Sequence, residues 1–210
     1  MKKKICIWAL VFLLPFIIYI GSFRLIAFDN DFYSDEFIKN NVDVEGKSEI
    51  STDMIYFLKN KDAGIERISS FNLIEQEHLI EVRDVMHWFI LVFNLAVFLF
   101  IANLYLLYFF DKKNFYLNLG KGLFYGSVVG VGIGVLLVLS VLSFDKVFAG
   151  FHALLFETQW QFPAGYLLAS LFPRQFFIDI FTRIVFISFM SSLVLGGIGY
   201  YLGKKQKVYK

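Results

Sequence analysis

The sequence contains little of what most kinds of enzyme chemistry depend on. It has one cysteine, three histidines and three prolines in 210 residues, and only 18% of its residues are charged. A single cysteine, Cys6, cannot form a disulfide within the chain, and it excludes metal sites built from two or four cysteines. The sequence has no G-x-S-x-G nucleophile motif, and its histidines are not spaced as H-E-x-x-H. We therefore expect any acyl chemistry to proceed without a serine or cysteine nucleophile, and we expect no metal, no cofactor and no nucleic-acid partner.

Apolar side chains are the residues that the sequence has in excess. Hydrophobic residues make up 58% of the chain and aromatic residues 20%, and the mean hydropathy is +0.63. A helix needs roughly 20 apolar residues to cross a bilayer core. Four stretches are long enough, and they comprise residues 5–28, 87–110, 123–144 and 176–202. Because these runs are continuous rather than alternating, they favour helices over barrel strands. The sequence predicts a mainly α membrane protein, a single membrane domain of residues 1–210 with four transmembrane helices.

Lysine clusters near the ends of these stretches predict the topology. They lie at the amino terminus, in the loop between the second and third stretches, and in the carboxy-terminal tail. Lysines are enriched on the cytoplasmic side of membrane helices, so both termini are expected in the cytoplasm. The first stretch is longer than the core of a signal peptide, and no small-residue cleavage site follows Phe28. We therefore expect it to be retained as a membrane helix.

Two longer segments, residues 29–86 and 145–175, are then expected on the outer side of the membrane. The first contains 14 acidic and 6 basic residues. Its pattern predicts helices at residues 54–58 and 69–86, and short extended pieces near residues 38–44 and 67–73 that could pair, which together would make a small α+β insertion. The second segment is too apolar for an ordinary solvated loop, so we expect it to be re-entrant or to lie in the membrane interface.

The third apolar stretch carries glycines at intervals of four residues, at Gly126, Gly130 and Gly134. Small residues in this pattern let helices approach closely in lipid. The favoured interpretation is tight packing between helices of one chain, and a dimer interface is the alternative.

Histidines are the best candidates for chemistry, and all three are expected at the outer membrane face. Glu81 follows His78 by three residues, which places both on one face of a helix. A carboxylate beside an imidazole fixes its tautomer and stabilises the imidazolium, which suits a general base. His152 lies in the apolar outer segment together with Trp160, either as an interface anchor or as a reactive group. His87 is interpreted as an interfacial residue at the start of the second span.

Two blocks of sequence resemble a family of small four-span membrane proteins from Gram-positive bacteria that includes the lipoprotein intramolecular transacylase. The first block contains a Glu-x-x-His-Leu-x-Glu-Val-Arg pattern that includes His78–Arg83. The second block, Phe151–Phe177, reads Phe-His-x-x-x-Phe, then Trp-x-Phe, then Leu-Phe-Pro-x-x-Phe-Phe. The resemblance extends over nearly the whole chain in order, length and number of spans.

The resemblance implies a specific activity at the outer face of a bacterial plasma membrane. The expected reaction moves the sn-2 acyl chain of a diacylglyceryl-modified lipoprotein to the α-amine of its amino-terminal cysteine, giving a lyso-form lipoprotein. The expected partners are such lipoproteins and membrane lipid. The expected catalytic residues are His78, His152 and Glu81, and the expected substrate-binding residues are Arg83, Phe151, Trp160 and Arg174. The alternatives are a non-catalytic sensor or accessory protein that binds lipid or a partner at the outer face, and a small transporter, which the lack of repeat symmetry disfavours.

Overall fold

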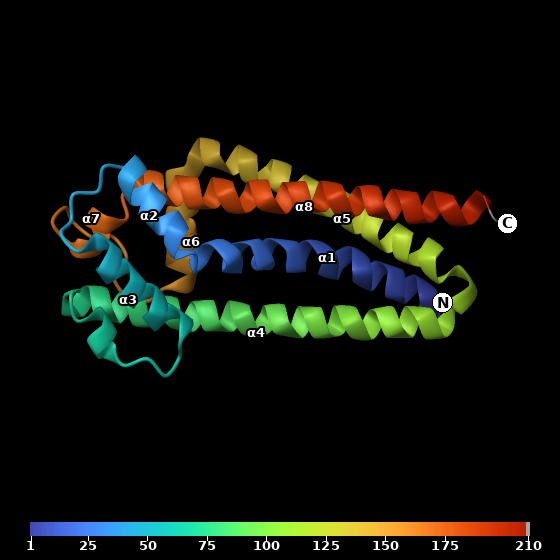
Figure 1. Cartoon of the computed structure of the whole chain (residues 1–210), viewed down its shortest axis with the longest axis horizontal. Helices are drawn as coiled ribbons and strands as arrows, with labels where there is room; N and C mark the ends of the chain where they lie inside the picture. Colours follow the sequence, from blue (N-terminus) through green and yellow to red (C-terminus); the bar gives the residue numbers. More distant parts are fainter. Residues whose placement is uncertain (209–210) are drawn as a thin grey trace. The chain divides into compact units, whose positions relative to one another are not determined.

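The chain is mainly helical in the part that the computed structural model describes, which is the backbone of residues 1–208 and the side chains of residues 1–205 (Figure 1). The α-helices are α1 (Lys2–Ala27), α2 (Asn30–Lys39), α3 (Lys47–Lys59), α4 (Leu73–Phe110), α5 (Phe115–Ser140), α6 (Phe144–Leu155), α7 (Leu167–Leu171) and α8 (Arg174–Val208). Short 3-10 helices lie between them at η1 (Ile65–Ile68), η2 (Lys112–Asn114) and η3 (Val141–Ser143).

Within the described residues, four helical stretches are long and apolar enough to cross a membrane, namely α1, α4, the run Lys112–Leu155 and α8. The prediction of a mainly α, multi-pass membrane protein is confirmed at this level. The helices extend beyond the predicted spans. The helix predicted at residues 69–86 is the first part of α4, which begins at Leu73 and continues without a break into the second span. A helix of 38 residues is about 57 Å long at 1.5 Å per residue, whereas the hydrocarbon core is about 30 Å thick. Part of α4 therefore extends beyond the core.

The expected α+β character of residues 29–86 is wrong, because residues 1–208 contain helices and turns but no strand. Residues 67–72 belong to η1 and to the turn that leads into α4, and Leu73 is the first residue of α4. Their apolar side chains Ile68 and Phe71 are buried, so they fill the core from a turn rather than from a sheet.

The other expected strand, residues 38–44, is occupied by the end of α2 and its cap. Asn41 has a left-handed backbone with φ 51°. The Val42 N–H donates to the Phe37 carbonyl at 3.0 Å, and the Asn41 N–H donates to the Ile38 carbonyl at 3.2 Å. These bonds form a Schellman motif, in which an asparagine tolerates the left-handed position and a hydrophobic contact closes the helix end. Val42 and Phe37 are both buried, so the β-branched residue that suggested a strand supplies that contact.

The chain forms two compact units, which are described separately. Unit 1 combines Met1–Phe23, Leu91–Leu139 and Ile184–Lys210. Unit 2 combines Arg24–Ile90 and Ser140–Arg183.

Glycines of α5 pack closely against other helices within unit 1, as the four-residue spacing predicted. A Cβ atom on Gly126 would lie 3.1 Å from the Leu14 side chain of α1, and one on Gly130 would lie 2.6 Å from the Ser192 hydroxyl of α8. The Tyr19 hydroxyl donates to the Gly130 carbonyl at 2.9 Å. Because glycine has no side chain, the hydroxyl can reach this backbone oxygen. Tight packing within one chain is therefore confirmed.

A second close approach in unit 1 brings the backbone of α5 against the backbone of α8. A Cβ atom on Gly199 would lie 2.6 Å from the Phe124 nitrogen and 2.8 Å from the Gly120 carbonyl oxygen. A Cβ atom on Gly197, two residues earlier on the same helix, would meet nothing within 4 Å. The two helices are therefore in contact at a point where only glycine fits.

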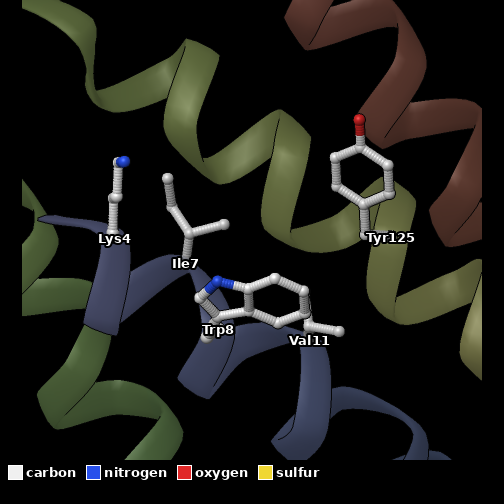
Figure 2. Close-up of a pocket in the computed structure, with 5 residues that line it drawn as sticks. All are labelled: Lys4, Ile7, Trp8, Val11 and Tyr125. Carbon is white, nitrogen blue, oxygen red and sulfur yellow. The ribbon is translucent and has the colours of Figure 1, made fainter.

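An open groove of about 310 Å³ also lies in unit 1, lined by Lys4, Ile7, Trp8 and Val11 of α1 and by Tyr125 of α5. Figure 2 shows the Lys4 amine and the Tyr125 hydroxyl at the two ends of a row of apolar side chains. The lining contains no carboxylate and no imidazole, so it offers no acid–base pair for chemistry near neutral pH.

Unit 2 contains an aromatic cluster that joins α2 to the region between α7 and α8. The Tyr33 ring lies 5.2 Å from the Phe176 ring and 6.0 Å from the Phe172 ring, measured between centroids. Phe37 stacks against Phe176 from the next turn of α2. All four side chains are buried, so this cluster fixes the start of α8 against α2.

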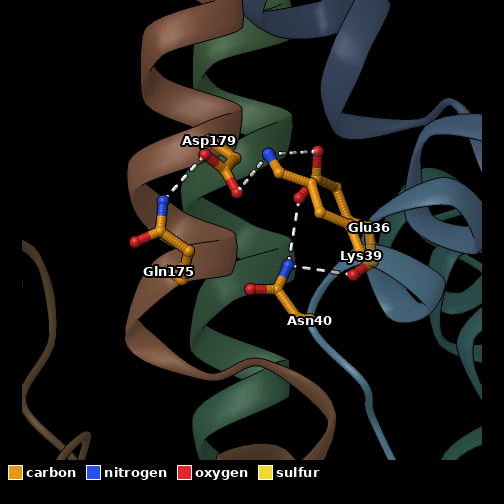
Figure 3. Close-up of polar contacts among 5 residues, drawn as sticks. All are labelled: Glu36, Lys39, Asn40, Gln175 and Asp179. Atoms are coloured by element: carbon orange, nitrogen blue, oxygen red, sulfur yellow. Dashed lines mark hydrogen bonds and ion pairs between the residues drawn. The ribbon is translucent and has the colours of Figure 1, made fainter.

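A polar network next to this cluster also ties α2 to α8 (Figure 3). The Lys39 ammonium lies 2.7 Å from Asp179 and 3.5 Å from Glu36. The Asn40 amide donates to Glu36 at 3.1 Å, and the Gln175 amide donates to Asp179 at 2.9 Å. Burial raises the pKa of Glu36. The hydrogen bond between Glu36 and Asp179 and the negative charge of Asp179 raise it further.

Candidate functional site

Two histidines from different helices meet in unit 2. His78 lies on α4 and His152 on α6, 74 residues apart in the sequence. Their ring centroids are 6.3 Å apart with an angle of 22° between the ring planes, and both side chains are buried. The two imidazoles are therefore close enough to act on neighbouring atoms of one substrate.

A hydrogen bond within α6 fixes the tautomer of His152. Its Nδ1 atom lies 2.8 Å from the Phe148 carbonyl oxygen, one helical turn earlier. A carbonyl only accepts hydrogen bonds, so Nδ1 must carry the proton and donate it. In the neutral ring, Nε2 then keeps its lone pair, and this atom can accept a proton from a substrate.

The environment of His78 favours the neutral ring. Burial lowers the pKa of His78 to about 4, the nearby His152 adds to the lowering, and the negative charge of Glu81 opposes it. The His78 Nδ1 atom is buried and has no hydrogen-bond partner among the described residues. At neutral pH, His78 is therefore an uncharged imidazole that can donate one N–H.

Glu81 was expected to orient His78, but its hydrogen bonds go elsewhere. The Thr158 backbone N–H donates to both carboxylate oxygens, at 3.2 and 3.3 Å. The Thr158 hydroxyl donates to the same carboxylate at 2.7 Å. The influence of Glu81 on His78 is through its charge, and its direct contact is with the segment that follows α6.

Aromatic side chains from residues 156–166 cover the two histidines. We call this segment, which joins α6 to α7, the strap. The Phe156 ring lies 4.8 Å from His78 and 5.2 Å from His152, and the Trp160 ring lies 4.9 Å from His152. The Phe162 ring lies 5.5 Å from His78. The strap therefore supplies much of the apolar wall around the pair.

Glu75 is a site-supporting residue to which sequence reasoning gave no role. It is almost completely buried, with 1% of its surface exposed. Its carboxylate accepts from the Asn72 N–H at 3.0 Å, while the Asn72 side chain accepts from the Glu75 N–H at 3.1 Å. This capping box closes the start of α4, and Asn72-x-x-Glu75 was a readable signal for it. The second Glu75 oxygen accepts from the Leu168 N–H at 2.7 Å, a contact between residues 93 positions apart.

The remaining expected residues are placed as follows. The Arg83 guanidinium donates to the Ala63 carbonyl at 3.1 Å and lies over the Phe57 ring of α3. Arg174 makes two hydrogen bonds to the Asp145 carboxylate, at 2.6 and 3.1 Å. Each guanidinium group thus has a partner within the protein, while the Arg83 Nε atom is buried without a hydrogen-bond partner among the described residues.

Phe151, by contrast, has 46% of its surface exposed beside His152, with 5.6 Å between the ring centroids. His87 is half-buried, and its Nε2 atom has no hydrogen-bond partner among the described residues. Ser143 and Lys146 have the spacing of a Ser-x-x-Lys motif. Both residues are exposed, whereas a lysine that activates a serine must be desolvated, so this pair does not provide a nucleophile.

Comparisons with known proteins identify relatives of the whole chain. A family model described as lipoprotein intramolecular transacylase Lit matches residues 6–177. A solved structure of the membrane integral lipoprotein intramolecular transacylase Lit from Bacillus cereus superposes with a TM-score of 0.85 over 98% of both chains, at 18% sequence identity.

Two further structures of the Bacillus cereus protein carry a histidine-to-arginine or a histidine-to-alanine mutation. They superpose with a TM-score of 0.81 at 17% and 18% identity. They cover 99% and 98% of this chain, and 95% and 96% of their own chains. A comparison with curated proteins found no match.

Proposed function

The chain belongs to the lipoprotein intramolecular transacylase family, and from that membership we propose that it converts diacylglyceryl-modified lipoproteins to the lyso form. The reaction moves the sn-2 acyl chain onto the α-amine of the amino-terminal cysteine. An amide forms, the sn-2 ester breaks, and one ester-linked chain remains on the glyceryl group. The observation that carries this proposal is the pair of buried imidazoles 6.3 Å apart.

The two histidines have different roles in this mechanism. The reaction is aminolysis of an ester with both groups on one substrate, so proximity supplies much of the rate advantage. His152 Nε2 takes the proton from the attacking amine, and the resulting imidazolium returns it to the departing glyceryl oxygen. His78 stays neutral, in keeping with its lowered pKa, and donates its N–H to the oxyanion of the tetrahedral intermediate. No covalent acyl-enzyme is required.

Phe151 and Trp160 contact the substrate acyl chains beside His152. Phe151 is exposed and Trp160 is half-buried, and both rings lie next to that imidazole, whereas Arg83 donates to Ala63 and Arg174 to Asp145. Membrane lipid surrounds the same region, since the exposed side chains of the second half of α6 are apolar, with Leu154 82% exposed. Residues 145–175 therefore lie in the outer membrane interface.

The topology of the proposal follows the lysine clusters. The spans are residues 5–28, 87–110, 123–144 and 176–202 of a single membrane domain in the bacterial plasma membrane. Both termini are cytoplasmic, and residues 29–86 and 145–175, with the histidine pair, are on the outer side.

Cysteine labelling tests this topology. In a Cys6→Ala background, Ser48→Cys is expected to react with a membrane-impermeant maleimide in intact cells, because Ser48 is exposed in an outer segment. Lys207→Cys is expected to react only after the cells are permeabilised. The opposite pattern would place the histidine pair in the cytoplasm and contradict the proposed site.

Mass spectrometry of a substrate tests the proposed reaction. The chain is co-expressed with a lipoprotein in a host without its own amino-terminal acylation, and the amino-terminal peptide is fragmented. Intramolecular transfer leaves the mass unchanged, so the fragments must show one acyl group on the cysteine amine and one on the glyceryl group. A free amine would contradict the activity, and a third acyl chain would contradict its intramolecular character. His152→Ala is the matched inactive control.

A further inference from the structure

The strap contains no helix, yet it supplies three aromatic rings to the histidine pair. Phe156, Trp160 and Phe162 make four ring contacts with His78 and His152. An irregular segment of this length loses roughly 1–2 kcal/mol of backbone entropy for each residue that is fixed. Specific contacts must therefore hold it against the helices.

Those contacts are made at both ends of the strap by carboxylates of α4. Near its first end, Thr158 donates its N–H and its hydroxyl to Glu81. Just beyond its second end, the Leu168 N–H at the start of α7 donates to Glu75 at 2.7 Å. Glu75 and Glu81 are six residues apart, or about 9 Å along the helix, and His78 lies midway between them.

We propose that Glu75 and Glu81 are positioning residues that fasten the strap over the two histidines. This inference rests on the proposed function, because it assigns the strap to the acyl-transfer site. Both carboxylates act through the strap rather than on the substrate. Glu81 holds the end that presents Phe156 and Trp160, and Glu75 holds α7 and the end that presents Phe162. The buried Glu75 also caps α4. One side chain therefore holds both the start of α4 and the start of α7, where the strap ends.

An experiment can separate two roles of Glu81. In one it holds the strap by hydrogen bonds, and in the other its negative charge stabilises the protonated form of His78. Thr158→Val removes the hydroxyl that donates to Glu81 and keeps the shape of the side chain and the carboxylate. If Glu81 acts only by its charge on His78, this variant should behave as the unmodified protein does. If Glu81 fastens the strap, kcat is expected to fall about tenfold, as for loss of a hydrogen bond to a charged group. Thr158→Ser restores the hydroxyl and is expected to recover most of the rate.

Titration of His78 by NMR of histidine-labelled protein supplies a readout that a loss of stability alone would not move. Burial under the strap keeps the pKa of His78 near 4. Loosening the strap hydrates the ring, so Thr158→Val and Glu75→Gln are expected to raise the pKa of His78 toward its ordinary value near 6.5. Glu77→Gln is the matched control, because Glu77 lies on α4 between the two carboxylates and is exposed.

Thr158→Val and Glu75→Gln are each expected to lower kcat and to raise the pKa of His78, while Glu77→Gln is expected to change neither. Glu75→Gln keeps one acceptor oxygen and so preserves the fold better than alanine. An unchanged kcat and His78 titration in Thr158→Val would overturn the fastening role of Glu81, and the same result in Glu75→Gln would overturn that of Glu75. The titration does not need substrate, so it decides the question even if the unmodified protein fails to acylate the amine.

Discussion

Replacing either His78 or His152 by alanine is expected to lower the single-turnover rate of acyl transfer by roughly 10²–10⁴, the usual range for acid–base groups. His152→Ala removes the imidazole whose tautomer is fixed by Phe148 so that Nε2 can accept the amine proton. His78→Ala removes the uncharged N–H donor assigned to the oxyanion. The measurement is the appearance of the amide-linked product from a purified lipoprotein in detergent or nanodiscs.

The double replacement is expected to cost little more than either single one, because residues that act as a unit are not additive. His87→Ala is the matched control and should retain most of the rate. Fully additive losses would show that the two histidines act in separate steps. A serine or cysteine ester trapped on the protein during turnover would contradict direct aminolysis.

The second large effect is expected at the contact between α5 and α8. Gly199→Ala should destabilise unit 1 by about 1–3 kcal/mol, because the new methyl group overpacks against backbone atoms that cannot rotate away. Gly197→Ala makes the same chemical change two residues away, where nothing lies within 4 Å, and gains the same helix propensity. Denaturation in detergent monitored by circular dichroism measures both. Equal stability of the two variants would mean that the helices separate without penalty at this point.

The membrane helices and the pairing of His78 with His152 could be predicted from the sequence, because both predictions depend on local patterns. Apolar runs and lysine positions are properties of contiguous residues, and they led to the prediction, still to be tested by labelling, that His78 and His152 lie on the same side of a bilayer. The resemblance to the transacylase family selected the same two residues. The close glycine packing was also readable, since it follows from a four-residue spacing within one helix.

Contacts between distant residues could not be read in this way. The spacing of Glu81 suggested His78, because a pattern within one helix shows only neighbours three or four residues away. Its hydrogen-bond partner, Thr158, lies 77 positions along the chain. The cap formed by Asn72 and Glu75 was visible in the sequence, but the contact of Glu75 with Leu168 was not. Residues 38–44 were misread because β-branched residues favour strands, whereas Val42 here closes a helix end.

The glycine contact between α5 and α8 has a consequence for biosynthesis. Gly199 is synthesised 79 residues after Gly120, which corresponds to a delay of roughly 4–16 s at ordinary translation rates. For the part of that interval in which α5 is complete and α8 is not, lipid tails are expected to cover the glycine surface that α8 later occupies. The nascent protein therefore passes through a stage in which α5 lacks its partner helix α8. A chain that terminates before α8 should remain at that stage and be removed by membrane-bound proteases.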